Sequence, residues 1–498
     1  MQATGNDKLT TNSLFWLWTA LLLVMVVRLY KLPQASLPDY DSVRNWQIVH
    51  EIAQGRLQNL FHHASPGFFI VFAPVAALHP DFHWFQYLNV MISVLAVGWL
   101  VAFIGRELDL QGPDLALMAL LVGTAVFPTF SSRDFTMGSL SLLVFVGLLR
   151  TYYQRVTEPS QSALLKAVVW LALGLCVNYK FLLTLPILAV LELLCNDKLL
   201  FRQKNLWRLL LILASPYLVL GLLGWAVGLP IYRWPATYYA VLFPSAINAA
   251  GRTGNVRLDL LYYFWFLIDF ELPLLLGIVF FPLVFGREIW TGLRRPNLLV
   301  YLAVWAYCLL GGMSLLLKAP RGLLFAYGLF AVLAYLCLLR LTRTRVVIKL
   351  VAVLLAVALN LFRIQREVYA YTPSNYPKAA AWLKAHKAEA LVSTVGQQIV
   401  PYVAPDSVIV ITDERQVAPL YKRGYRYVLL DAYWRVAGIR HFQGLRKQKP
   451  VAAWSEPILT SPLLFLEHSE FTGLGYEETL AIQRAAKQDS LQLRLLQL

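Results

Sequence analysis

The sequence carries a series of apolar blocks, most of them close to the length that a lipid bilayer requires. A helix needs about 20 mostly apolar residues to cross the hydrocarbon core. Only 14% of the 498 residues are charged, whereas a soluble domain carries about a quarter. Such a chain cannot cover a water-facing surface, so it is predicted to be a polytopic α-helical membrane protein. The predicted spans, eleven in number, are 14–30, 84–104, 115–130, 134–153, 163–179, 181–195, 208–228, 259–285, 298–317, 322–340 and 346–362.

Three parts of this pattern allow more than one interpretation. The stretch 163–195 contains Asn178 and Lys180, and we divide it there into two spans. Residues 67–79 are apolar but short and contain Pro74, which suits a re-entrant helix, an interfacial helix or the first part of a longer span. The first block is not followed by a small-residue cleavage site, so we interpret it as a retained span rather than a signal peptide.

Positive charge in short loops predicts the orientation. If the N-terminus is cytoplasmic, Lys and Arg gather in the cytoplasmic loops 105–114, 154–162, 196–207, 286–297 and 341–345, and at their edges. The opposite side then receives the loops 31–66 and 229–258 and the tail 363–498. This pattern also explains much of the formal net charge of +16. No basic-aromatic motif typical of nucleic-acid binding is present.

The tail differs from the rest of the chain, because charges become frequent and apolar runs shorten. We predict two domains, a multi-span transmembrane domain at 1–362 and a soluble extracytoplasmic α/β domain at 363–498, which we interpret as accessory. Strands that alternate with helices indicate a small parallel sheet. The predicted strands are 391–395, 408–412, 427–431 and 491–496, and the predicted helices are 397–403, 414–423 and 474–488.

Four polar clusters lie at the outer ends of the predicted spans, where ionisable groups are expensive and indicate function. Each also has a structural interpretation. Asp residues are common helix N-caps, adjacent histidines are often interfacial, and an Arg-Asp pair can cap the next helix. The clusters are Asp39 and Asp41, His62 and His63, Arg133 and Asp134, and Lys318 and Arg321.

The cations among them favour a functional interpretation. Lys318 and Arg321 stand on the side where the charge rule disfavours positive residues, and Lys180 lies near the same surface. Cations at this depth suit the phosphate of a lipid headgroup. A carboxylate on the preceding outer loop suits general-base catalysis. The four cysteines have no metal-binding spacing and are interpreted as small buried apolar residues.

In this order the motifs resemble the GT-C superfamily of membrane glycosyltransferases, in the branch of protein O-mannosyltransferases and aminoarabinose transferases. The resemblance covers about residues 10–370. It departs from the family pattern at Ser42, where an acidic pair is usual, and at Gly322, where Tyr is usual. The matching elements are Asp41, the helix ending at Gly55, the turn 63–68, Arg133-Asp134, the stretch 174–180 and the turn 318–323.

The resemblance implies an enzyme of the bacterial inner membrane that inverts the sugar it transfers. A polyprenyl-phosphate sugar would be the donor, and a lipid, glycan or protein hydroxyl the acceptor, among membrane lipids. Asp41 would be the base. Asp39, two residues away, would point the same way in an extended segment and share the role. No cofactor and no metal are expected. The substrate-binding residues would be His63, Arg133, Asp134, Lys180, Lys318 and Arg321.

Two other functions would also place charges among many spans. A transporter or flippase should show repeats and helices broken at matching positions, and none is visible in the sequence. A non-catalytic partner in cell-envelope polysaccharide assembly would keep the fold without needing Asp41.

Overall fold

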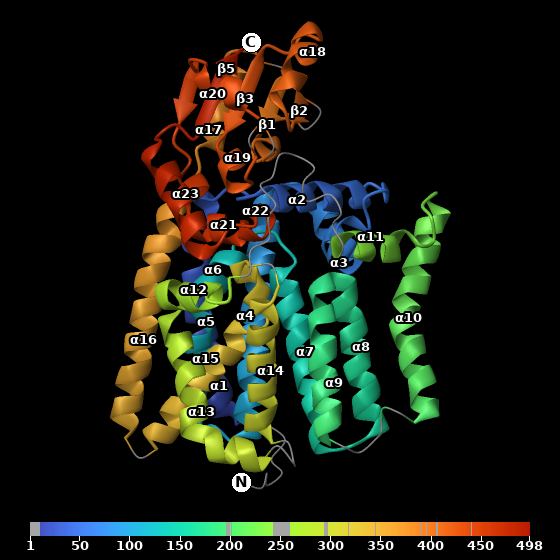
Figure 1. The fold of residues 1–498 in the computed structure, drawn as a ribbon, viewed down its shortest axis with the longest axis vertical. Coiled ribbons are helices and arrows are strands. Elements are labelled where there is room, and N and C mark those ends of the chain that lie inside the picture. The colour runs from blue at the N-terminus through green and yellow to red at the C-terminus, as the bar shows by residue number, and fades with distance from the viewer. Residues whose placement is uncertain are drawn as a thin grey trace.

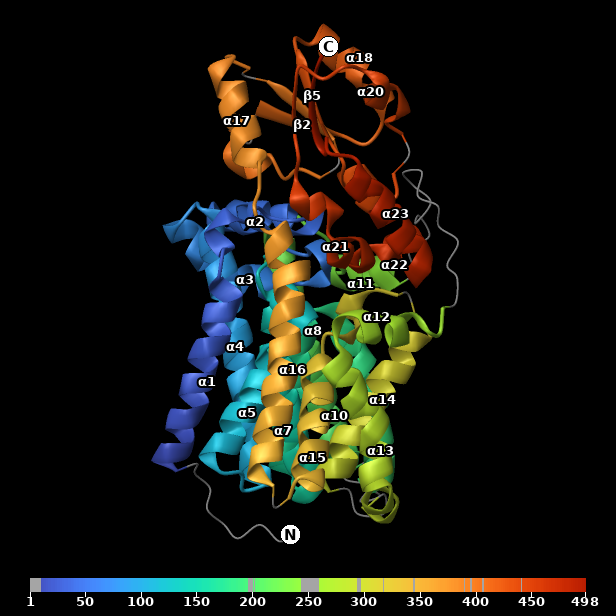
Figure 2. The same cartoon turned by 90° about the vertical axis from the view of Figure 1, so that its left-hand side faces the viewer.

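A bundle of long helices forms one end of the molecule and a small sheet forms the other (Figures 1 and 2). Parts of the predicted loops 196–207, 229–258, 286–297 and 341–345, and the last residue of the predicted strand 391–395, lie outside the described residues. The computed structural model describes residues 10–195, 200, 202–242, 259–292, 297–316, 318–343, 345–388, 390–394, 396–404, 407–439 and 441–498.

Each predicted span contains a helix, but the number of spans is not confirmed as eleven. Within the described residues, five helices are long and apolar enough to cross a membrane, or six if α5 and α6 count as one bent span. Of the other described bundle helices, α7 has 20 residues and the rest have 17 or fewer. The bundle helices are α1 (Thr11–Leu29), α4 (Phe82–Glu107), α5 (Gly112–Gly123), α6 (Val126–Ser132), α7 (Gly138–Thr157), α8 (Gln161–Val177), α9 (Thr184–Cys195), α10 (Gln203–Ala226), α12 (Tyr262–Phe270), α13 (Leu272–Gly292), α14 (Leu298–Ser314), α15 (Tyr327–Leu341) and α16 (Val346–Glu367).

The surface of the bundle is apolar, as a lipid-facing surface must be. Leu283 on α13 exposes 74% of its area and Trp290 exposes 78%. Charge is instead enclosed and paired between helices, where Arg155 donates to the Glu192 carboxylate at 2.7 Å. The chain is therefore a multi-pass helical membrane protein.

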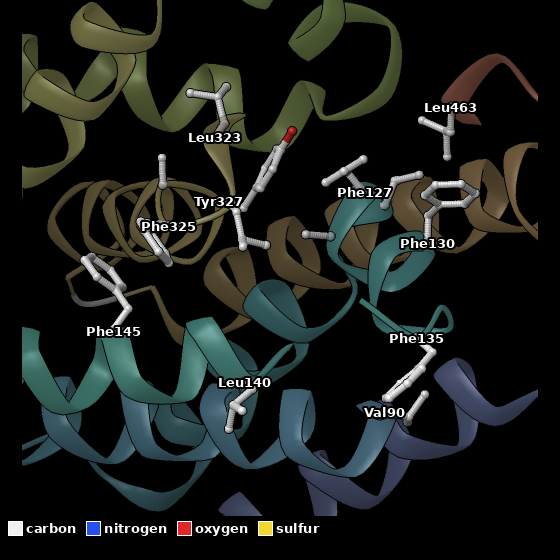
Figure 3. Close-up of a cluster of buried hydrophobic side chains, with 14 of the residues drawn as sticks. Val90, Phe127, Phe130, Phe135, Leu140, Phe145, Leu323, Phe325, Tyr327 and Leu463 are labelled. Carbon is white, nitrogen blue, oxygen red and sulfur yellow. The ribbon is translucent and has the colours of Figure 1, made fainter. Parts of the chain in front are cut away.

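Aromatic and small side chains hold the bundle together (Figure 3). Phe145 on α7 stacks on Phe325 with ring centroids 4.6 Å apart. Helices α13 and α15 approach closely at Gly277, where an added Cβ would lie 2.5 Å from the Cβ of Ala334. Such contacts between small residues are typical of helix packing in membranes, where there is little hydrophobic drive between helices.

The predicted span 115–130 is broken, because α5 and α6 are bent by 70°. A buried carboxylate supports the break. Glu271, at the start of α13, accepts a hydrogen bond from the backbone N–H of Phe127 at 2.7 Å. It thereby satisfies a backbone donor that the new helix start would leave unpaired. The turn that follows α6 carries Arg133 and Asp134 to the end of the bundle nearest the sheet.

A layer of short elements separates the bundle from the sheet (Figure 1). Residues 67–79 belong to this layer as a separate helix, α3, which ends at Leu78 before α4 begins, so they are not the first part of a longer span. The layer and the turns beside it contain η1 (Leu32–Gln34), α2 (Tyr40–Ala53), η2 (His62–Ala64), α3 (Pro66–Leu78), η3 (Tyr179–Leu183), α11 (Arg233–Leu242), η4 (Pro320–Leu323), η5 (Tyr369–Tyr371), η9 (Pro457–Thr460), α21 (Pro462–Glu467) and α22 (Ser469–Thr472).

The sheet has five strands in the order β2-β1-β3-β5-β4. The prediction of a parallel sheet is correct for β1, β2 and β3, but β5 runs antiparallel to both β3 and β4. The short strand β4 was not predicted. The strands are β1 (Leu391–Thr394), β2 (Val408–Ile411), β3 (Tyr427–Asp431), β4 (Ala452–Trp454) and β5 (Leu493–Gln497).

Helices surround this sheet, and one predicted helix is wrong. Residues 397–403 form only the single turn η6 (Val400–Tyr402), since Pro401 lacks an N–H and restricts the residue before it. The predicted helix 414–423 is a turn, η8 (Glu414–Gln416), followed by α18 (Val417–Lys422). The remaining helices are α17 (Tyr376–Ala385), α19 (Tyr433–Val436), α20 (Gln443–Lys447) and α23 (Tyr476–Gln488), the last close to its predicted range.

Candidate active site

The start of α2 separates the two predicted carboxylates. Asp39 is the N-cap residue, and its Oδ1 accepts hydrogen bonds from the backbone N–H of Ser42 at 2.8 Å and from the Ser42 hydroxyl. Its side chain is 1% exposed. Asp41 lies in the first helical turn and keeps 20% of its side chain exposed. Because the segment is helical, residues two apart point in different directions. The expectation that both carboxylates point the same way was therefore wrong.

Arg321 faces Asp41 across the site. It lies in the tight turn η4 between α14 and α15, and its Nη1 is 3.5 Å from Asp41 Oδ2. Its Nε donates to Glu470 Oε1 at 3.0 Å, and its Nη2 donates to the same oxygen. The guanidinium therefore lies between a carboxylate on α2 and a carboxylate on α22.

His63 approaches Asp41 from the turn before α3. Its Nε2 lies 3.3 Å from Asp41 Oδ1. His63 and Ala64 both have left-handed backbone conformations, with φ of 50° and 56°, which are uncommon for residues other than glycine. Strained backbone of this kind is often found at functional sites. Here it forms the turn from which the imidazole faces Asp41.

Lys180 lies beside the same cluster. Its Nζ donates to the backbone carbonyl of Arg321 at 3.2 Å, and its own N–H is bonded to the side chain of Asn178 at 3.0 Å. Burial lowers the pKa of Lys180 to about 8, although Glu470 opposes that effect. Lys180 thus supports the turn that carries Arg321 and adds a second cation next to it.

The two aspartates differ in charge as well as in position. Burial and the neighbouring Asp41 raise the pKa of Asp39. Burial would also raise the pKa of Asp41, but His63 and Arg321 outweigh it and hold that pKa below its usual value. Paired carboxylates whose pKa values are pushed apart are typical of catalytic sites. Asp41 is ionised and partly accessible, whereas Asp39 is buried and its protonated form is favoured.

Three residues of the C-terminal domain complete the cluster and were not predicted. Glu470 binds Arg321, His468 Nε2 lies 3.6 Å from Asp39 Oδ2, and the hydroxyl of Tyr433 is 2.8 Å from that imidazole. The domain is therefore more than the accessory part that the sequence indicated. One signal was available: residues 462–466 form an apolar run inside a polar tail and lead directly into Glu467 and His468.

Three predicted site residues have other surroundings. Arg133 donates to the carbonyls of Arg28 at 2.8 Å and Tyr30 at 2.7 Å, and to the Thr372 hydroxyl at 3.0 Å. These contacts join α1, the turn after α6 and the end of α16, and they do not include Asp41. Arg133 therefore connects elements of the fold.

Lys318 and Asp134 also lie apart from Asp41. Lys318 Nζ donates to the carbonyl of Ser314, the last residue of α14, at 2.8 Å and to the carbonyl of Leu316 just beyond it, and so caps that helix. Asp134 is buried, and its side chain accepts from the N–H of Phe135 at 2.6 Å. Burial and nearby Asp39 raise its pKa well above the usual value. Within the described residues, no three His, Cys, Asp or Glu side chains are arranged to hold a metal ion.

The bundle, the layer of short elements and the small C-terminal sheet together form a fold that is also found in solved glycosyltransferase structures. The chain has this fold in common with ArnT from Cupriavidus metallidurans, an aminoarabinose transferase. The apo structure of ArnT matches with a TM-score of 0.58 and 14% identity. The structure bound to undecaprenyl phosphate matches with a TM-score of 0.57 and 13% identity. Both matches cover 85% of this chain and 94% of ArnT.

A third solved structure is more distant. The oligosaccharyltransferase of Archaeoglobus fulgidus in its apo form has a TM-score of 0.49 and 11% identity, over 84% of this chain and 70% of that one. No family model and no curated protein sequence matches the chain. The two ArnT matches confirm the predicted resemblance to the GT-C superfamily at the level of the fold.

Proposed function

We propose that the protein transfers a sugar from a polyprenyl-phosphate-linked donor to an acceptor hydroxyl. The observation that carries this proposal is the ion pair at the partly exposed Asp41, where an ionised carboxylate meets Arg321 at 3.5 Å. A carboxylate that can take the proton of the acceptor hydroxyl thus lies next to a cation that can bind the donor phosphate. The shared fold supports the proposal, since the ArnT structure holds undecaprenyl phosphate.

In the proposed reaction the acceptor oxygen attacks the anomeric carbon of the donor sugar. Its proton passes to Asp41. The bond from the anomeric carbon to the phosphate oxygen breaks, and polyprenyl phosphate leaves with the electron pair. Arg321 stabilises the charge on that phosphate, and Lys180 reinforces it. A single displacement inverts the configuration at the sugar.

The proposed setting is the outer face of a bacterial inner membrane. The site lies at the end of the bundle that carries the C-terminal domain, opposite the N-terminus (Figure 1). With a cytoplasmic N-terminus, residues 363–498 form an extracytoplasmic domain above the site. The donor chain then lies in the outer leaflet, and the acceptor is a lipid, glycan or protein that reaches Asp41 from outside. No cofactor is part of this proposal.

The test is Asp41→Asn, which keeps the size of the side chain but removes the proton acceptor. We expect turnover to fall by about 10²–10⁴-fold, as loss of a general base does. Expression and binding of undecaprenyl phosphate should change little. Purified protein is assayed with a panel of polyprenyl-phosphate sugars. Asp81→Asn is the matched control, because Asp81 also lies beside a histidine, His83, but has 57% of its side chain exposed.

The rival carboxylate is tested in the same assay. Asp39→Asn should reduce turnover much less, because Asn can also cap a helix and Asp39 is buried away from the acceptor. A larger loss in Asp39→Asn than in Asp41→Asn would refute the assignment of the base. Unchanged lipid-linked substrate levels in a cell lacking the protein would instead favour a transporter or a non-catalytic partner.

A further inference from the structure

Arg321 is held between two carboxylates that come from different parts of the chain. Its Nε and Nη2 both donate to Glu470 Oε1, and its Nη1 lies 3.5 Å from Asp41 Oδ2. Each of the three guanidinium nitrogens therefore already faces a carboxylate. A phosphate binds a guanidinium through the same edges. It can engage Arg321 fully only by replacing one of these two carboxylates.

Glu470 is the carboxylate in the position that a phosphate would take. A single oxygen of Glu470 receives two N–H groups from one edge of the guanidinium, and a phosphate can accept hydrogen bonds along the same edge. Asp41 makes a single, longer contact and belongs to α2, a helix of 14 residues. Glu470 belongs to the four-residue helix α22, and 15% of its side chain is exposed. Its carboxylate can leave Arg321 by rotation about its own side-chain bonds.

The charge of the cluster supports the same exchange. Burial would raise the pKa of Glu470, but Arg321 and Lys180 outweigh it and lower that pKa, so Glu470 is ionised. A sugar phosphodiester carries a single negative charge, as the carboxylate does. Replacing one with the other leaves the net charge next to Arg321 unchanged. Replacing Asp41 instead would displace the proposed base from the reaction.

We propose that Glu470 occupies the place of the donor phosphate on Arg321 and gives it up when the donor binds. This inference rests on the proposed function. Glu470 then determines donor affinity, because an anion must compete with a carboxylate already in place, and a neutral lipid cannot do so. Donor binding also releases the polar contact that α22 makes with the turn η4, so the C-terminal domain responds to an occupied site.

The first experiment measures binding of undecaprenyl phosphate to purified protein by calorimetric titration. Glu470→Gln keeps the shape but removes the competing charge, and we expect on the order of tenfold tighter binding, the effect of one charged hydrogen bond. Glu477→Gln is the matched control, since that side chain is 74% exposed on α23, and it should bind as the wild type does. Unchanged or weaker binding by Glu470→Gln would overturn the inference.

A second pair of variants tests whether the effect acts through Arg321. In Arg321→Gln, undecaprenyl phosphate should bind weakly, and adding Glu470→Gln should then give no tightening. Tightening that persists without Arg321 would overturn the inference. Inorganic phosphate at the same concentration should compete poorly, because it lacks the lipid chain; strong competition would indicate a soluble-anion site and contradict the proposal.

A third measurement needs no variant. Hydrogen exchange of residues 462–472 in the wild type should increase when undecaprenyl phosphate is added, and no increase would argue against release of Glu470. The failures are distinguishable. A wild type that does not bind undecaprenyl phosphate contradicts the proposed function and this inference together, whereas a wild type that binds it with no effect of Glu470→Gln contradicts this inference alone.

Discussion

Asp39 and Asp41 are chemically identical, and their difference comes from where α2 begins. The helix starts at Tyr40, so Asp39 becomes the cap and Asp41 enters the first turn. Asp39 is buried next to His468, whereas Asp41 is in contact with Arg321 and His63. A helix that started two residues later, at Ser42, would make Asp41 the cap instead. The assignment of the base therefore depends on local backbone geometry more than on residue type.

At this scale we predict the stability of two variants of the cap. Asp39→Ala should lower the melting temperature, because loss of an N-cap costs about 0.5–2 kcal/mol. Asp39→Asn should melt close to the wild type, since Asn also accepts from the backbone N–H of Ser42. Thermal unfolding in detergent measures both. Equal melting temperatures for the Ala and Asn variants would show that the cap contributes little.

The sequence identified several of these residues for physical reasons. Arg321 stood out because positive charge is disfavoured on the outer side, and Asp41 because an outer carboxylate near a span needs an explanation. Glu470 could not be found in this way. An acidic residue in a polar tail looks like any solvated side chain, and only the fold brings it to a turn 149 residues earlier in the chain.

The elements of the bundle are joined by polar contacts that the sequence did not distinguish from ligand contacts. Arg133 was predicted to bind substrate because it is a cation at an outer turn. Its three bonds instead reach the end of α1 and the region after α16. The charge of a residue indicates that it needs partners, but it does not say whether those partners are a ligand or backbone carbonyls.

We therefore predict that Arg133→Met destabilises the protein without impairing the chemistry. Each bond from a charged donor contributes about 1.5–3 kcal/mol, so the melting temperature should fall clearly. Turnover per folded molecule should stay within a few-fold of the wild type, in contrast to Arg321→Gln. Arg423→Met, at an exposed position after α18, serves as the control. If Arg133→Met kept the wild-type melting temperature but lost turnover, Arg133 would have to be assigned to the active site.

Helix α21 gives a pH-dependent prediction. Burial raises the pKa of Glu467, its last residue, from 4.5 to about 8. Because the folded pKa is higher, the stabilising effect of the bound proton is fully present below pH 4.5 and is lost as the pH rises through 8. The melting temperature of the wild type should therefore fall between pH 5 and 8 more steeply than that of Glu467→Gln. Parallel curves for the two proteins would contradict a buried, protonated Glu467.

Element boundaries show where sequence reasoning reached its limit. The apolar stretches predicted the positions of the helices well, but several helices are shorter than the predicted spans. Helix α9 has only 12 residues, and α5 is interrupted by a 70° bend at a site supported by Glu271. The carboxylate that accepts a hydrogen bond at this break, Glu271, is far away in the sequence, so residues 115–130 alone give no sign of the bend. The antiparallel strand β5 was likewise placed correctly along the chain, but its direction depends on the path through α23.

For the whole molecule we predict opposite sides for the two ends of the bundle. The start of α1 and the sheet lie at opposite ends of the molecule (Figure 2), Arg150 lies in the second half of α7, and residue 373 follows α16 and η5. Reporter fusions after Arg150 should read cytoplasmic, and fusions after Pro373 should read external. The same result from both fusions would contradict an extracytoplasmic C-terminal domain.

The contact between Arg321 and Glu470 has a consequence for the order of synthesis. Asp41 leaves the ribosome long before Glu470 does. All bundle helices can be inserted into the membrane before the residue that completes the cluster has been translated. The cluster is therefore complete only after the segment that carries Glu470 has folded onto the bundle. A chain released before that point would be an inserted protein with an incomplete cluster.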